Sequence, residues 1–193
     1  LINTAAENAD VAVITLSRFS AEGVDRKPID SDYYLSFEEK SLIDRASKAF
    51  KKTIVVLNSG AVVDCEHFAD NDKVQGILFG WQGGLEGGAA VADILCGDVC
   101  PSGKLADTIP VSYYSYQNAE EFLTGFEHLD YYDDIYVGYR YFETRYEDVV
   151  MGTAKAGDYD WAKTVAYPFG YGDSYTDFTY SNFNVTESDD AFD

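Results

Sequence analysis

The sequence predicts an α/β fold in which a mostly parallel sheet is sandwiched by helices and followed by an irregular, tyrosine-rich C-terminal tail. Three observations lead to this prediction. Apolar runs at residues 11–16, 54–57 and 74–81 have the length of buried strands. Helical segments alternate with these runs, as in parallel sheets joined by right-handed crossovers. Near Pro110 the alternation stops, and of the 16 tyrosines only Tyr33 and Tyr34 precede residue 113.

The first predicted helix begins at a capping box. Ser36 and Glu39 stand three residues apart, so each side chain can accept a hydrogen bond from the backbone N–H of the other residue. The helix is expected to run to about Phe50. The apolar spacing predicts a buried stripe made of Leu42, Ile43, Ala46 and Ala49.

The third apolar run leads through a glycine-rich turn, residues 83–88, into a second helix near residues 89–95. A strand, a glycine turn and a helix together form the arrangement that binds phosphate at a helix N-terminus. The spacing, however, matches neither the dinucleotide fingerprint nor the P-loop, and Glu86 would repel a phosphate. We therefore interpret the glycines as letting the helix approach the sheet closely. Gly97 is expected to end this helix, with Pro101 just beyond.

Charge and cysteine content disfavour several classes of partner. Fourteen Lys and Arg residues against 34 Asp and Glu residues leave a net charge of −20, which would repel nucleic acid and anionic membrane surfaces. No apolar stretch approaches the roughly 18 residues of a membrane-spanning helix. Three cysteines cannot all pair internally, so a reducing, cytoplasmic compartment is the simpler expectation. No zinc-type ligand spacing or calcium-loop pattern occurs, and no metal site is expected.

The loop after the first predicted strand carries the main candidate for chemistry. Residues 21–26 (AEGVDR) follow that strand, and ligands of open α/β sheets bind beyond the carboxyl ends of the strands. Glu22 is therefore a candidate catalytic residue. Asp25 and Arg26 can pair with each other or with neighbours and so hold the loop in one shape. On position alone, an exposed loop with ordinary charges explains these residues equally well.

Six segments, taken together and in this order, resemble the α/β sandwich domain of glycoside hydrolase family 3, in its β-glucosidase branch. The resemblance covers residues 11–180. The segments are residues 21–26 (AEGVDR), 55–60 (VVLNSG), 81–88 (WQGGLEGG), 97–105 (GDVCPSGKL), 136–142 (YVGYRYF) and 168–176 (PFGYGDSYT). Asp173 stands where the family more often has leucine, which concerns only the local packing of that turn.

The resemblance implies half of an active site. Retaining glycosidases use two carboxyl groups about 5–5.5 Å apart. In the family the nucleophile is an aspartate on a neighbouring (β/α)8 barrel, and the general acid/base of the β-glucosidase branch is a glutamate of the sandwich domain, which Glu22 matches. Glu86 is the second candidate, and Asp25 and Arg26 would bind substrate or position the loop. The expected substrate is a β-linked glucoside or oligosaccharide, without a cofactor. Because a barrel takes roughly 250 residues, this chain alone is expected to be inactive.

Composition and resemblance together predict three parts. Residues 1–110 form the sandwich core, which is incomplete at its N-terminus. Residues 111–180 form a tyrosine-rich extension that wraps the sandwich or docks against the barrel domain of the same parent chain, and residues 181–193 begin a truncated linker or fibronectin-like module. For any single tyrosine of the extension, packing is favoured over direct contact with a sugar. A different function stays open: a non-catalytic carbohydrate-binding or structural partner domain.

Overall fold

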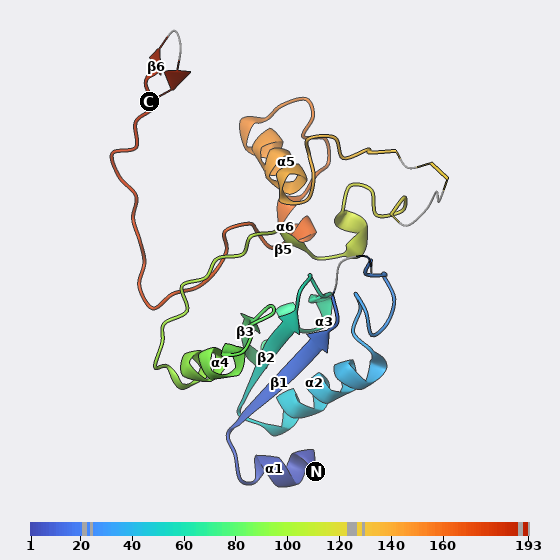
Figure 1. Ribbon diagram of the computed structural model, residues 1–193, viewed down its shortest axis with the longest axis vertical. Helices are drawn as coiled ribbons and strands as arrows, with labels where there is room; N and C mark the ends of the chain where they lie inside the picture. The colour runs from blue at the N-terminus through green and yellow to red at the C-terminus, as the bar shows by residue number, and fades with distance from the viewer. Residues whose placement is uncertain (21–22, 24, 123–126, 129, 189–190, 193) are drawn as a thin grey trace.

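A three-stranded parallel sheet forms the centre of the fold (Figure 1). The computed structural model describes residues 1–20, 23, 25–122, 127–128, 130–188 and 191–192. The strands are β1 (Val11–Arg18), β2 (Lys52–Ser59) and β3 (Val74–Phe79), in the spatial order β1-β2-β3. The register pairs Arg18 with Ser59 and Leu57 with Phe79, so the carboxyl ends of the strands meet at one edge of the sheet. The predicted α/β class with a parallel sheet is confirmed.

Helix α2 (Phe37–Ala49) begins at the predicted capping box. The Ser36 hydroxyl accepts a hydrogen bond from the Glu39 N–H at 3.2 Å. The Glu39 carboxylate in turn accepts one from the Ser36 N–H at 2.8 Å. Both pairs satisfy backbone donors that the first turn of a helix leaves free, which explains why the helix begins at this residue.

The buried stripe of α2 differs in part from the prediction. Ile43 and Ala46 are buried, as predicted, whereas Leu42 is 42% exposed and Ala49 is partly buried. Ser47 is buried in their place. Positions 43, 46 and 47 are spaced by three and four residues and therefore share one helix face, and Leu42 lies beside that face. The core of which Ile43 and Ala46 are part includes Ile14, Leu16, Val55 and Leu57 of the sheet.

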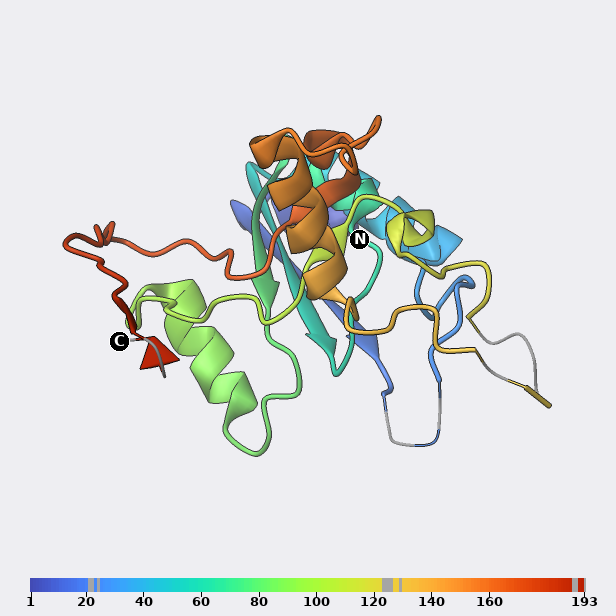
Figure 2. The same ribbon diagram turned by 90° about the horizontal axis from the view of Figure 1, so that it is seen from above.

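Helix α4 (Gly87–Cys96) lies on the other side of the sheet from α2 (Figure 2). It ends where predicted, at Gly97, whose φ of 82° is the left-handed conformation common at helix ends. None of its residues is buried. On this side of the sheet Val11 and Val13 of β1 are 43% and 49% exposed. The second helical layer is therefore much more open than the layer formed by α2.

In the glycine-rich turn before α4, the close backbone contacts lie within the turn and not between the turn and the sheet. A Cβ atom on Gly83 would lie 2.7 Å from the Cα atom of Gly87. Between the sheet and the helix there is a hollow of about 420 Å³, whose lining includes Thr15, Asn58 and Val91. The glycines thus allow the chain to fold back on itself, and α4 does not approach the sheet as closely as the sequence led us to expect.

The described part of residues 111–164, called the extension from here on, lies across the carboxyl ends of the strands (Figure 1). It is joined at its base, where β4 (Ile109–Pro110) pairs antiparallel with β5 (Val165–Tyr167). Next to this pair, the Leu105 N–H donates to the Tyr171 carbonyl at 2.8 Å, and the Gly170 N–H donates to the Leu105 carbonyl at 2.7 Å. The two ends of the extension are thereby held together by the β4–β5 pair and the adjacent hydrogen bonds of Leu105. The remaining short helices are α1 (Ile2–Ala6), α3 (Glu66–Ala69), η1 (Tyr113–Ser115) and α6 (Trp161–Thr164).

The extension contains a 13-residue helix, α5 (Tyr139–Met151), that the sequence analysis did not predict. Aromatic residues such as those of its first half (YRYFETRY) are enriched in strands, and this local preference pointed away from a helix. Packing decides the outcome, because the Phe142 side chain is fully buried and lies edge-to-face against Tyr116, with ring centroids 5.8 Å apart. Gly138 and Gly152, both with positive φ, flank the helix.

Near the C-terminus, β6 (Glu187–Ser188) and β7 (Ala191–Phe192) form a two-residue antiparallel pair. The sequence analysis assigned these residues to a linker or fibronectin-like module, and that assignment stays a prediction. None of the helices in the described part of the chain combines the length and the apolar character needed to cross a membrane.

The crowding at Gly83 predicts opposite effects for two Gly→Ala changes in the same turn. Gly83→Ala is expected to lower the free energy of unfolding by about 1–3 kcal/mol, because the added methyl group meets backbone atoms of Gly87. Gly88→Ala is the matched control. A Cβ atom there meets nothing within 4 Å, and alanine in a helix is favoured over glycine by about 0.8–1 kcal/mol. Urea unfolding measures both, and equal effects would contradict the tight turn.

Candidate active site

Three connections meet at the carboxyl edge of the sheet: the long loop that follows β1, the turn at Gly60 after β2, and the glycine-rich turn after β3. This is the edge at which ligands of parallel sheets bind. Of the three predicted site residues, Glu22 lies outside the described residues. Asp25 is exposed, and the Arg26 side chain is 14% exposed.

Arg26 binds Asp32, which lies six residues further along the same loop. Its Nε atom donates to the Asp32 carboxylate, and its Nη2 atom donates to the Asp32 carbonyl. Its Nη1 atom reaches the Ser59 hydroxyl at the end of β2, at 3.3 Å. Within the described residues, Asp25 forms no ion pair or side-chain hydrogen bond. Of the two pairings that the sequence left open for Arg26, the structure shows pairing with a neighbour.

Asp32 also accepts a hydrogen bond from Arg18, the last residue of β1. Arg18 Nε donates to the Asp32 carbonyl at 2.8 Å, and the Lys27 N–H donates to the Asp32 carboxylate at 2.8 Å. Burial alone would raise the pKa of Asp32, but the hydrogen bonds from Lys27 and Arg26 outweigh it and hold the pKa below its usual value. Asp32 therefore joins the end of β1 to the returning part of the loop.

The same Arg18 fixes the loop to α2. Its two Nη atoms donate to the two carboxylate oxygens of Glu39, at 2.7 and 2.6 Å, in the bidentate geometry typical of strong arginine–carboxylate pairs. Burial disfavours the charge on Glu39, but the hydrogen bonds from Arg18 and from the Ser36 N–H prevail and lower the pKa of that carboxyl. Glu39, which forms the capping box of α2 with Ser36, is thus also bound to the end of β1.

The opposite end of the loop is held by Gln82, a residue that the sequence analysis missed. Gln82 Nε2 donates to the Ser20 carbonyl at 3.2 Å, across 62 residues of chain. Gly60 leaves room for this amide, because a Cβ atom there would lie 2.8 Å from Gln82 Nε2. The preceding residue, Trp81, has a φ of 48°, which is uncommon for a residue other than glycine. Ser20 and Arg26, which stand on either side of positions 21–25 in the sequence, are therefore both held by hydrogen bonds to other parts of the chain.

Glu86, the second carboxylate candidate, lies at the N-cap position of α4. Its side chain is exposed and forms no capping hydrogen bond. Among the described residues, no group of three or more His, Cys, Asp or Glu side chains is placed to hold a metal ion. The chemistry that the described groups offer is therefore that of hydrogen-bonded carboxylates, guanidinium groups and phenols.

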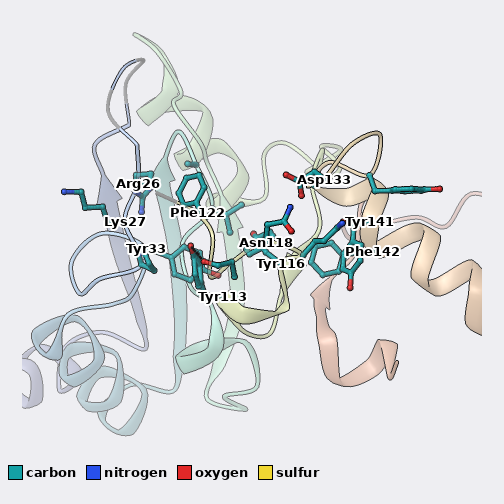
Figure 3. Close-up of a pocket in the computed structure, with 17 residues that line it drawn as sticks. Arg26, Lys27, Tyr33, Tyr113, Tyr116, Asn118, Phe122, Asp133, Tyr141 and Phe142 are labelled. Carbon is teal, nitrogen blue, oxygen red and sulfur yellow. Dashed lines mark hydrogen bonds between the residues drawn. The ribbon is translucent and has the colours of Figure 1, made fainter. Parts of the chain in front are cut away.

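A pocket of about 330 Å³ lies beside Arg26, between the loop after β1 and the extension (Figure 3). Arg26 and Lys27 lie at one side of it, and Tyr141 and Phe142 of α5 lie at the other. Most of the lining is aromatic or aliphatic. The sequence analysis did not find this pocket, because its residues come from parts of the chain that are about 100 positions apart.

Edge-to-face contacts between aromatic rings build the wall of the pocket. The ring centroids of Tyr33 and Tyr113 are 5.4 Å apart, those of Tyr113 and Tyr116 are 6.2 Å apart, and Phe142 follows Tyr116. Such contacts each contribute about 0.5–1.5 kcal/mol beyond simple burial. Burial raises the pKa of Tyr33 and of Tyr116, so both phenols stay neutral at ordinary pH.

Comparison with known proteins gives consistent matches over almost the whole chain. The model of the glycosyl hydrolase family 3 C-terminal domain matches residues 2–175. Beta-glucosidase A of Butyrivibrio fibrisolvens is 40% identical over 207 residues, which cover 96% of this chain and 23% of that protein. Exo-alpha-(1->6)-L-arabinopyranosidase of Bifidobacterium longum is 33% identical over 95% of this chain and 22% of that protein.

Solved structures agree with the sequence matches. The structure of beta-glucosidase 3B from Thermotoga neapolitana in complex with glucose has 42% sequence identity and a TM-score of 0.77, and the match covers 96% of this chain and 24% of that chain. The chain therefore spans about a quarter of the length of the relatives that it matches.

The contacts of Asp32 predict a loss of stability that depends on pH. Asp32→Ala is expected to lower the free energy of unfolding at pH 7 by about 1.5–3 kcal/mol, because Arg26 and Lys27 lose a charged acceptor. Asp25→Ala is the control, with an expected change within about 0.5 kcal/mol.

The direction of the pH effect follows from the lowered pKa of Asp32. Its contribution is fully present above the unfolded pKa, about 3.9, and disappears as the pH falls through the lower folded value. The difference between wild type and Asp32→Ala should therefore shrink below about pH 4. Urea unfolding between pH 7 and pH 3 measures it, and a difference that stays constant would argue against the ion pair.

Proposed function

Because the chain belongs to glycoside hydrolase family 3, through the C-terminal domain of that family, we propose that it supplies the general acid/base of a retaining β-glycosidase. The residue is Glu22, in the loop that follows β1. The observation that carries the proposal is the anchoring of this loop on both sides of Glu22: Gln82 binds Ser20, and Asp32 binds Arg26. A catalytic carboxyl group needs such support, because small displacements from the productive geometry cost much of the rate.

The reaction would proceed in two steps. Glu22, protonated, donates its proton to the glycosidic oxygen while an aspartate attacks the anomeric carbon and forms a glycosyl–enzyme intermediate. Ionised Glu22 then removes a proton from the water that releases the sugar. The aspartate belongs to a (β/α)8 barrel, which takes roughly 250 residues. The greater length of the relatives, about four times that of this chain, leaves room for such a barrel in the same parent polypeptide.

Asp25 and Arg26 have different parts in this proposal. Arg26 holds the returning part of the loop through Asp32 and so positions Glu22. Asp25 is exposed and has no side-chain partner among the described residues, so its carboxylate remains available to accept a hydrogen bond from a sugar hydroxyl. The first is a positioning residue and the second a candidate for substrate binding.

The proposed substrates are β-linked glucosides or oligosaccharides. Relatives named as beta-glucosidases, and solved structures that contain glucose, support a glucose-type sugar. The arabinopyranosidase of Bifidobacterium longum indicates that related chains serve more than one sugar. A net charge of −20 argues against nucleic acid or anionic membranes as partners. The three cysteines are free thiols, which suits the proposed cytoplasmic compartment.

One observation favours the second candidate function, a non-catalytic carbohydrate-binding or structural domain. The aromatic pocket beside Arg26 could bind a ligand without any chemistry. The two functions differ in what Glu22 does, because a binding domain does not need an acid at that position.

Substitution of Glu22 in the parent polypeptide distinguishes the two functions. Glu22→Ala should lower turnover of an aryl β-glucoside by about 10²–10⁴-fold, because the second step loses its general base. With a good leaving group the first step persists, so added azide should restore turnover and give β-glucosyl azide. Glu86→Ala is the matched control and should leave turnover unchanged. Unchanged activity in Glu22→Ala would favour the binding-domain function.

The isolated 193-residue chain should hydrolyse no β-glucoside, because only one of the two carboxyl groups lies in it. Release of 4-nitrophenol from its β-glucoside, followed by absorbance, measures this. The parent polypeptide serves as positive control. Turnover by the isolated chain that is lost in Glu22→Ala would contradict a site shared with a barrel domain.

A further inference from the structure

We propose that the contacts of helix α5 form a pH-sensitive interface, which holds the helix more firmly when the Glu143 carboxyl carries a proton. One face of α5 makes these contacts, and its four residues are spaced by three or four positions: Tyr139, Phe142, Glu143 and Tyr146. This face and its partners are called the α5 interface. None of them lies between β1 and α2, so the interface is independent of the proposed role of Glu22.

Three of the four residues hold α5 through contacts between aromatic rings. The Tyr139 ring stacks on Phe169, two residues beyond β5, with centroids 4.3 Å apart. The Tyr146 ring meets Trp161 of α6, with centroids 4.8 Å apart. Between these two contacts, the Phe142 side chain is buried. The face is therefore aromatic at each of these positions except 143.

Glu143 places a carboxyl group in this aromatic interface. Its Oε1 atom is buried and has no hydrogen-bond partner among the described residues. None of the ion pairs in that part of the chain includes Glu143. Arg145, two positions along α5, is paired with Asp148, and its guanidinium lies 4.9 Å from the centre of the Tyr159 ring. A buried charge without a partner is unfavourable, so the interface accommodates the neutral carboxyl better.

Two segments pack against this carboxyl. The first precedes β4, where Thr108 is completely buried and forms a side-chain hydrogen bond with Glu143. The Thr108 N–H donates to the Asp107 carboxylate at 2.8 Å, and the Thr108 hydroxyl accepts from the Phe169 N–H at 3.1 Å. Residues 107–110 therefore contribute a second, half-buried acid and no base.

The second segment precedes α6. The Tyr159 hydroxyl is buried there and, like Oε1 of Glu143, has no hydrogen-bond partner among the described residues. Burial and the nearby Tyr141 raise the pKa of Tyr159 to about 12, so this phenol stays neutral. In α6, the exposed Lys163 is paired with Asp160 at 2.7 Å. Within the described residues of both segments, no base thus offsets a charge on Glu143.

The direction of the pH effect follows from burial. Burial raises the pKa of Glu143, and the hydrogen bond with Thr108 acts against it without cancelling it. Burial likewise raises the pKa of Asp107. A carboxyl whose folded pKa is raised contributes stability below its unfolded pKa, about 4.3 for glutamate, and loses this contribution as the pH rises through the folded value. The α5 interface is therefore firmest in mild acid.

The interface acts on the pocket, because Tyr141 and Phe142 of α5 form one side of that pocket (Figure 3). When Glu143 loses its proton, α5 separates from its partners more often, and this side of the pocket opens with it. The fold thus links the shape of the pocket to pH through a carboxyl that does not line it.

Hydrogen exchange in the parent polypeptide tests the interface, with peptides resolved by mass spectrometry and rates corrected for the intrinsic pH dependence of exchange. In wild type, protection of residues 139–151 should fall by about three- to ten-fold between pH 4.5 and pH 8, since one unit of pKa shift corresponds to about a factor of ten. Protection of residues 37–49, in α2, should stay constant and serves as the internal control.

Glu143→Gln keeps the shape of the side chain and removes its charge. In this variant α5 should be better protected than in wild type at pH 8, and equally protected at pH 4.5. Adding Asp107→Asn should remove the pH dependence that remains. Glu147→Gln is the matched control, because Glu147 is an exposed glutamate of the same helix, and it should behave like wild type.

Wild-type protection of α5 that does not change with pH would overturn the proposal, and this measurement needs no variant. Weaker protection in Glu143→Gln than in wild type at pH 8, with α2 protected as before, would overturn it as well. A pH dependence that persists in the Asp107→Asn/Glu143→Gln double variant would assign the titration to another group and so contradict the role of Glu143.

Discussion

The conformation of the loop that follows β1 depends on the hydrogen bonds that Asp32 accepts. Its carbonyl accepts from both Arg18 and Arg26, and its carboxylate accepts from Arg26 and from the Lys27 N–H. One residue therefore joins the last residue of β1 to the returning part of the loop. Through Arg18 the same contacts reach Glu39 and the capping box of α2. The shape of the loop and its link to the start of α2 thus involve two carboxylates, Asp32 and Glu39, and two arginines, in a chain with few basic residues.

The extension adds the second wall of the site. The pairing of β4 with β5 brings its two ends together, so the residues between them must leave the sandwich and return to it at one place. Because the extension lies across the carboxyl ends of the strands, Tyr113 meets Tyr33 of the loop after β1 (Figure 1). Most of those that line the pocket pack on each other, and the packing forms a cavity.

The two sides of the sheet differ in how firmly they are covered. Helix α2 is packed into the core through Ile43 and Ala46, whereas α4 buries none of its residues, although its sequence is largely apolar. Strand β1 also exposes Val11 and Val13 on the side where α4 lies. Buried contacts therefore concentrate on the α2 side of the sheet, and the hydrogen-bonded loop after β1 and the pocket lie at its carboxyl edge.

Local patterns in the sequence determined the α/β class, the capping box at Ser36 and the end of α4 at Gly97, because each of these depends on residues within a few positions of one another. Tertiary structure decided what local patterns do not contain. The Gln82 side chain donates a hydrogen bond to the Ser20 carbonyl, 62 positions away in the sequence. Helix α5, whose aromatic residues favour a strand, buries Phe142. The pocket joins three distant segments. Glu22, outside the described residues, stays a prediction from family resemblance, since a single glutamate in a loop has no pattern of its own.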